Sequence, residues 1–188
     1  MKKYFKVITF LILILPAFLY GGQENDLKYE FIKTDSSYSF RGSFVVNADF
    51  DCLIDVVYKF ENISKYTSGA KSIKLLRQGE KWYEVTYTYR KLIFFENKSI
   101  WRRALERDEG KVVFEMISSK NNVSIMPDVL SSKGYYQIKP ENEGFRVEYF
   151  QECTLKPGLL KNTYINKAKK EAIKFLDLFK KYVEKMCD

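Results

Sequence analysis

The sequence predicts an α+β domain: a curved antiparallel sheet of about six to seven strands wrapped around a long C-terminal helix, with two short helices after the first strand. Two patterns predict this architecture. The middle of the chain contains successive stretches in which apolar and polar residues alternate, as they do in half-buried strands. Residues 156–186 instead repeat apolar side chains every three or four positions, as an amphipathic helix does.

The first elements are a strand and two short helices. Residues 36–47, "SSYSFRGSFVVN", alternate in the manner of a strand. Residues 48–66 follow with apolar side chains at helical spacing, and Asp49 or Asp51 can cap the first turn. A second short helix within this stretch is expected to end near Gly69.

Six further strands complete the predicted sheet. They are expected over residues 72–78, 80–90, 98–107, 111–119, 134–140 and 145–155. In the second of these, Tyr83, Val85 and Tyr87 share one face, opposite polar residues such as Glu84. A sheet with one polar face must bury its other face against a second layer.

The final helix is the only predicted element long enough to cover that sheet. Its apolar stripe comprises Ile165, Ala168, Ala172, Phe175, Leu176, Phe179, Val183 and Met186. Pro157 and Gly158 precede it as a turn. A helix laid across a concave sheet can leave a hollow, and spacing alone leaves open whether side chains or a ligand fill it.

Composition excludes several function classes. The chain of 188 residues contains no histidine, which excludes Ser-His-Asp and Cys-His catalysis and histidine metal sites. We therefore predict no metal and no cofactor. The net charge of +8 comes from interspersed residues, which does not indicate a nucleic-acid partner. A mild basic excess is compatible with transient contact with an anionic membrane surface.

Residues 1–22 have the pattern of a signal peptide, with a basic start and an apolar run from Val7 to Leu19. That run is too short for a spanning helix, which needs roughly 20 residues. We expect an exported protein, periplasmic or secreted; an uncleaved membrane anchor is the alternative. No repeat or Pro/Gly-rich linker divides the remainder, so residues 27–188 are read as one domain.

The order of elements resembles the helix-grip fold of the START-like superfamily, also called SRPBCC or polyketide-cyclase-like. The resemblance covers residues 36–186. "GYYQIKP" is similar to the family's glycine-aromatic strand, and "LKPGLLKNTYINKA" to the start of its closing helix. A second proline that is common there is missing, and Lys161 stands near its place. The resemblance implies a cavity for an apolar molecule, often a lipid, sterol or polyketide.

Inward-facing residues of the sheet and the last helix are the candidate ligand-binding residues. They are Tyr87, Trp101, Arg103, Phe114, Tyr136, Val147, Tyr149, Gln151, Ala168 and Phe175. Apolar walls with a few polar groups are typical of small-molecule sites. Plain core packing is the alternative. The residues alone favour packing, whereas the resemblance favours a cavity.

Two of these residues are polar. If Trp101 faces inward, Arg103 does too and could hold a carboxylate or phosphate; with the opposite parity Arg102 is the inward one. The residues favour an arginine at the rim, paired with a surface glutamate. Gln151 lies on the apolar face of its strand, where it could bind a ligand hydroxyl or a neighbouring tyrosine.

Two further features are a possible disulfide, which depends on the resemblance, and an apolar loop. In the resembled fold the first short helix lies against the last one, which would allow a Cys52–Cys187 disulfide. The loop over residues 119–133 carries Ile125, Met126, Val129 and Leu130 without a strand pattern. These apolar residues could gate a cavity or contact a membrane, or the loop could fold over the edge of the sheet.

The sequence therefore predicts an exported binding or transport protein for a hydrophobic small molecule, most simply a lipid. A cyclase- or hydrolase-like enzyme using tyrosines and a carboxylate is one alternative. A protein-interaction module with a filled core is another. No catalytic constellation stands out in the sequence.

Overall fold

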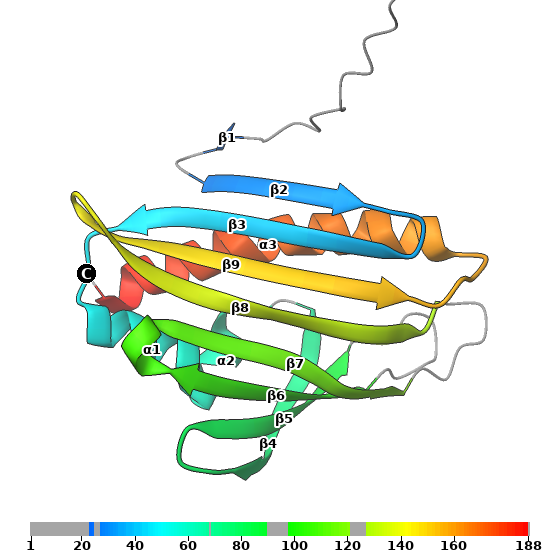
Figure 1. Cartoon of the computed structure of the whole chain (residues 1–188), viewed down its shortest axis with the longest axis horizontal. Helices are drawn as coiled ribbons and strands as arrows, with labels where there is room; N and C mark the ends of the chain where they lie inside the picture. Colours follow the sequence, from blue (N-terminus) through cyan, green and yellow to red (C-terminus); the bar gives the residue numbers. More distant parts are fainter. Residues whose placement is uncertain (1–22, 25–26, 68, 90–97, 121–126, 188) are drawn as a thin grey trace, which may run out of the picture.

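The computed structural model describes residues 23–24, 27–67, 69–89, 98–120 and 127–187, which form nine strands, three α-helices and one 3-10 turn (Figure 1). The strands are β1 (Gln23–Glu24), β2 (Leu27–Lys33), β3 (Ser37–Val46), β4 (Ala70–Gln78), β5 (Trp82–Tyr89), β6 (Lys98–Glu106), β7 (Lys111–Lys120), β8 (Val129–Glu141) and β9 (Gly144–Leu155). The helices are α1 (Phe50–Tyr58), α2 (Phe60–Tyr66), η1 (Arg107–Glu109) and α3 (Lys161–Cys187).

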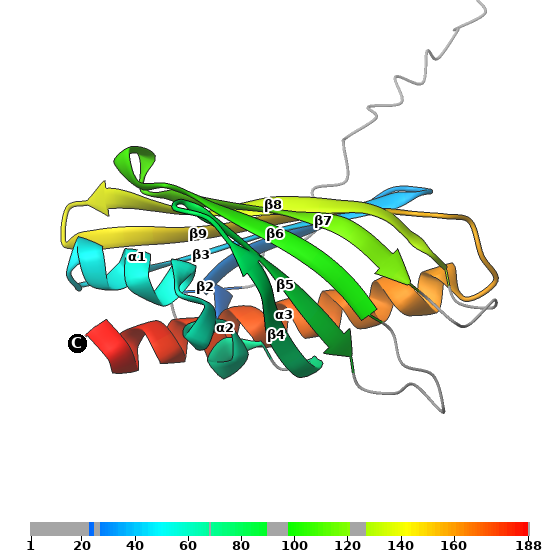
Figure 2. The same ribbon diagram turned by 90° about the horizontal axis from the view of Figure 1, so that it is seen from below.

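All strands belong to one antiparallel sheet with the order β1-β2-β3-β9-β8-β7-β6-β5-β4. The sheet curls around α3, which runs beneath its concave side (Figure 2). Helices α1 and α2 cross from β3 to β4 near the C-terminal end of α3. The predicted fold class is thus confirmed, with the long helix covering the inner face of the sheet.

The sheet has more strands than the six to seven predicted. The added strands, β1 and β2, precede the first predicted strand at the edge of the sheet. In β2, Leu27 and Phe31 are buried, but the exposed Ile32 breaks the alternation, so the pattern did not identify a strand. Strand β8 begins at Val129, earlier than predicted, because its first residues pair with the end of β9 rather than forming a loop.

Helix α1 begins and ends with defined hydrogen bonds. The side chain of Asp49 accepts from the backbone N–H of Cys52 at 3.0 Å, which identifies Asp49 rather than Asp51 as the cap. At the other end, the carbonyl of Val57 accepts from Arg103 and that of Tyr58 from the hydroxyl of Tyr83. Side chains from the sheet therefore satisfy carbonyls that the helix leaves unpaired.

Helix α3 buries Ile165, Leu176, Phe179 and Val183 against the sheet. Leu176 lies directly over Gly42 of β3, where an added Cβ would come within 2.6 Å of the leucine Cδ2. Met186, predicted on the buried stripe, is exposed, and the buried stripe of α3 ends at Val183.

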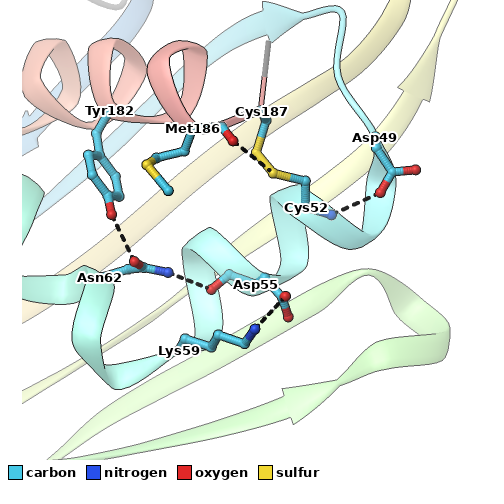
Figure 3. Close-up of a disulfide and its surroundings, with 8 residues drawn as sticks. All are labelled: Asp49, Cys52, Asp55, Lys59, Asn62, Tyr182, Met186 and Cys187. Atoms are coloured by element: carbon cyan, nitrogen blue, oxygen red, sulfur yellow. Dashed lines mark hydrogen bonds and ion pairs between the residues drawn. A yellow bond between two sulfur atoms is a disulfide. The ribbon is translucent and has the colours of Figure 1, made fainter.

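A disulfide between Cys52 of α1 and Cys187 of α3 joins the two helices, with their Cα atoms 5.8 Å apart (Figure 3). This is the pairing that the resemblance allowed. Nearby, the hydroxyl of Tyr182 donates to Asn62 of α2 at 2.8 Å, and Asn62 donates to the carbonyl of Asp55 at 3.0 Å. Covalent and polar contacts together fix the C-terminal end of α3 to α1 and α2.

We expect the Cys52→Ser, Cys187→Ser double variant of residues 23–188 to lose about 2–4 kcal/mol of unfolding free energy, because the bridge closes a loop of 135 residues. Urea unfolding with and without reductant measures this. Reductant should destabilise the wild type and leave the double variant unchanged. Equal effects on both proteins would show that the stabilisation comes from elsewhere.

Gly42→Ala should lower the unfolding free energy by about 1–3 kcal/mol, because the new methyl group overlaps Leu176 and forces α3 away from β3. Gly69→Ala is the matched control, since no atom lies within 4 Å of its added Cβ. Thermal unfolding of both variants compares them. Similar melting temperatures would contradict the proposed close packing.

Candidate functional site

The inner face of the sheet divides into two parts along α3. The first part, called the closed end, lies under the C-terminal half of α3 and consists of fully buried side chains. It comprises Arg103, Phe114, Tyr136, Tyr149 and Phe179. The second part, called the open end, lies toward the N-terminal half of α3, and its side chains are only half-buried. It comprises Tyr87, Tyr89, Trp101, Tyr164 and Ala168.

Aromatic rings pack against one another at the closed end. The ring of Tyr136 lies 5.1 Å from that of Tyr149 and 5.3 Å from that of Phe179, measured between centroids. Phe175 of α3 lies 4.7 Å from Tyr149, and Tyr66 of α2 lies 5.0 Å from Phe179. These tilted contacts are favourable aromatic geometries. Side chains therefore occupy the part of the inner face where the sequence had left a hollow open.

The open end combines aromatic rings with a short polar chain. Tyr87 stacks on Tyr89 at 6.1 Å and meets the edge of Trp101 at 6.3 Å. The indole N–H of Trp101 donates to Ser99 at 2.7 Å, and the Ser99 hydroxyl lies 3.2 Å from that of Tyr89. On α3, the small Ala168 is also half-buried. Half-buried aromatic surface is suited to contact with an apolar ligand.

Arg103 lies inside the molecule, only 3% exposed, so the expectation of a rim arginine is wrong. Its Nη2 donates to the carbonyl of Val57 at 3.1 Å, and its guanidinium lies 5.0 Å from the ring centroid of Tyr136. Its Nε is buried without a hydrogen-bond partner. The positive charge benefits from the C-terminal end of α1 and from the aromatic rings.

Arg102 points to the outer face of the sheet, where it meets Glu84. The glutamate accepts from Arg102 at 2.9 Å and from Arg77 at 2.7 Å, and both guanidinium groups lie over the ring of Trp82. The hydrogen bond from Arg77 is the main reason why the pKa of Glu84 lies below its usual value. The sequence placed Glu84 on a polar face but missed its burial, which depends on three adjacent strands.

Gln151 is held by its neighbours. It accepts from the hydroxyl of Tyr149 at 2.7 Å and donates to Ser132 at 3.0 Å. Of the two roles that the sequence left open, the structure shows the bond to a tyrosine. Cross-strand pairing of β8 with β9 brings Ser132 into reach, which the sequence could not indicate.

The structure thus brings most of the predicted ligand-binding residues onto one face. Arg103, Phe114, Tyr136, Val147 and Tyr149 are buried, whereas the others are half-buried. Those others are Tyr87, Trp101, Gln151, Ala168 and Phe175. Sequence reasoning missed Tyr66, Ser99 and Tyr164. Tyr66 and Tyr164 lie on helices at positions whose distance to the sheet only the tertiary structure sets.

Two hollows border the outer surface. One, of about 340 Å3, lies over β6 to β9 around Gly134, and the other, of about 200 Å3, lies over β2, β3 and β9. Neither is lined by α3. Among the described residues no group of His, Cys, Asp or Glu side chains could hold a metal ion, and no helix is long and apolar enough to span a membrane. Ile125 and Met126 of the predicted gating loop lie outside the described residues, whereas the exposed Leu130 belongs to β8.

Comparison with known proteins identifies the fold. No family model and no curated sequence matches the chain. The structure of an aromatase/cyclase from Streptomyces is similar to this one, with a TM-score of 0.63 and 11% sequence identity to this chain. The similar region covers 79% of this chain and 94% of the aromatase/cyclase. A STAR-related lipid transfer protein from Xanthomonas axonopodis has 13% identity and a TM-score of 0.62, covering 86% and 96%.

A plant protein extends this similarity. A major latex-like protein from Panax ginseng has 10% identity and a TM-score of 0.55, covering 80% of this chain and 97% of its own. At such low identities these likenesses establish the fold and nothing finer. The fold is the helix-grip fold that the order of elements had indicated.

Burial raises the pKa of the inner-face tyrosines Tyr83, Tyr136 and Tyr149. A raised pKa favours the neutral form in the folded state, so the resulting stability is complete below the unfolded pKa of about 10 and is lost above it. We expect unfolding free energy to fall steeply above pH 10. Absorbance at 295 nm should show these tyrosines ionising only with unfolding, whereas the urea-unfolded chain titrates near pH 10. Full titration without loss of structure would contradict their burial.

Proposed function

We propose, from the premise that this chain has the helix-grip fold, that it is an exported protein that binds or carries a hydrophobic small molecule, a lipid, between sheet and α3. The open end is the observation that supports this proposal most strongly. There, Tyr87, Trp101 and Ala168 belong to the inner side of the fold and are only half-buried. Apolar surface that a ligand covers contributes about 25 cal/mol per Å2.

We expect a ligand to enter beside the N-terminal half of α3. The disulfide and the bonds of Tyr182 fix the C-terminal end of this helix, and Leu176, Phe179 and Val183 are buried there. In the first half, only Ile165 is buried among the described residues. A ligand would therefore displace α3 at the end where fewer contacts oppose it.

Export is supported by two independent features. Residues 1–22 have the signal-peptide pattern, although they lie outside the described residues. The Cys52–Cys187 disulfide is typical of proteins in an oxidising environment such as the periplasm or the secretory pathway. The same features fit the alternative, a domain held at a membrane surface by an uncleaved anchor.

A protein-interaction module with a filled core remains the main competitor, because aromatic rings pack the closed end. An enzyme has less support. Acid–base chemistry would need a carboxylate beside an inner tyrosine. The group bonded to Tyr149 is instead the neutral amide of Gln151.

Retention of lipid tests the proposal. Native mass spectrometry of the purified chain, before and after incubation with a bacterial lipid extract, should show a lipid-bound species. Ala168→Trp should reduce that species about tenfold or more, since an indole overpacks the open end. Lys170→Trp, on the exposed side of the same helix, is the matched control and should bind as the wild type does.

Absence of any lipid-bound species in the wild type would reject the binding proposal and favour the interaction module. Equal loss in both tryptophan variants would show that binding does not occur at the open end.

A further inference from the structure

Arg103 and Tyr66 are two buried polar groups that the packing of the closed end leaves incompletely satisfied. The Nε of Arg103 and the hydroxyl of Tyr66 have no hydrogen-bond partner, and both residues are at most 3% exposed. An unsatisfied buried donor costs about 1–3 kcal/mol. Two such groups on the inner face, contributed by β6 and α2, indicate a polar site inside an otherwise aromatic cluster.

The charge of Arg103 has no acidic counterpart among the described residues. On the outer face, Arg102 and Arg77 share the carboxylate of Glu84. On the inner face, the groups around Arg103 are the carbonyl of Val57 and aromatic rings. These groups stabilise a cation but do not neutralise it, and a buried charge without a counter-ion is costly.

We infer that the ligand carries an anionic oxygen group, which Arg103 and Tyr66 bind at the closed end once the aromatic rings packed there move aside, while the apolar remainder lies along the open end. This inference rests on the proposed function, because it specifies the ligand of the same site. Both residues offer N–H or O–H donors, as recognition of an oxygen anion requires.

The strand register connects the two ends. In the pairing of β5 with β6, Tyr87 lies opposite Ser99, and Tyr83 lies opposite Arg103. Trp101 stands between them, two positions from Arg103, or about 7 Å along the strand. A ligand whose polar group reaches Arg103 would thus place its hydrocarbon chain along Trp101 and Tyr87. The two ends therefore suit the polar and the apolar part of an amphipathic molecule.

A carboxylate fits this site better than a phosphate monoester. Its single negative charge matches the single guanidinium, and its planar oxygens match the guanidinium fork. A phosphate monoester carries about −1.5 to −2 at pH 7 and would bury uncompensated charge. The site therefore favours a fatty-acid-like molecule over a phosphorylated one.

Three probes that share the same hydrocarbon chain test this inference: hexadecanoic acid, its methyl ester and hexadecyl phosphate. Native mass spectrometry and calorimetry should show the wild type binding the acid about 10- to 100-fold more tightly than the ester, as a charge-assisted hydrogen bond provides. Arg103→Gln should abolish this preference without weakening the ester. Tyr66→Phe, which removes only a hydroxyl, should reduce it about 3- to 10-fold.

Arg107→Gln is the control, because it removes the same charge from an exposed position. It should keep the preference of the wild type. Arg103→Gln could also disturb the end of α1, so circular dichroism must show it folded, and Tyr66→Phe provides an independent measurement.

Three outcomes would count against this site. If acid, ester and phosphate bind the wild type equally, Arg103 and Tyr66 do not recognise an anion, although lipid binding stands. If none of the probes binds, both this inference and the proposed function are rejected. If the phosphate binds tightest and depends on Arg103, the site recognises an anion but not a carboxylate.

Discussion

The packing of α3 against the concave side of the sheet is the contact on which the rest of the structure depends. A curled antiparallel sheet with apolar inner residues cannot remain uncovered in water. Gly42 lets Leu176 approach the backbone of β3, and the Cys52–Cys187 disulfide fixes the end of the helix. Burial, helix position and the shape of the inner face all follow from this one interface.

Side chains pack more tightly at one end of this interface than at the other, and this difference defines the two ends of the candidate site. Large rings such as Phe179 fill the end near α1 and α2, whereas Tyr87 and Trp101 are only half-buried at the other end. The C-terminal half of the helix therefore supplies most of the buried contacts, and our proposal places the apolar part of the ligand along the other half. A cross-linked end beside a less buried one is a physical basis for local opening without loss of the fold.

The polar groups inside the apolar layer are the second feature that shapes the inner face of the sheet. Arg103 contributes to the fold by satisfying a carbonyl at the end of α1, yet its Nε stays without a partner. Gln151 illustrates the opposite case, since Tyr149 and Ser132 satisfy its amide. Inner-face positions on the same sheet can thus have their polar atoms fully or only partly hydrogen-bonded, and only their partners distinguish them.

The sequence by itself determined the fold class, the central strands and the long amphipathic helix, because alternation and helical spacing are local properties of the chain. It also placed residues such as Phe114 and Tyr149 on the inner face. It missed the edge strand β2, whose pattern Ile32 interrupts, and misjudged Arg103, whose burial depends on the parity of β6. Only the tertiary structure decided which inner residues touch, how Glu84 is shared by two arginines and which end is filled, because these depend on strand register and helix position.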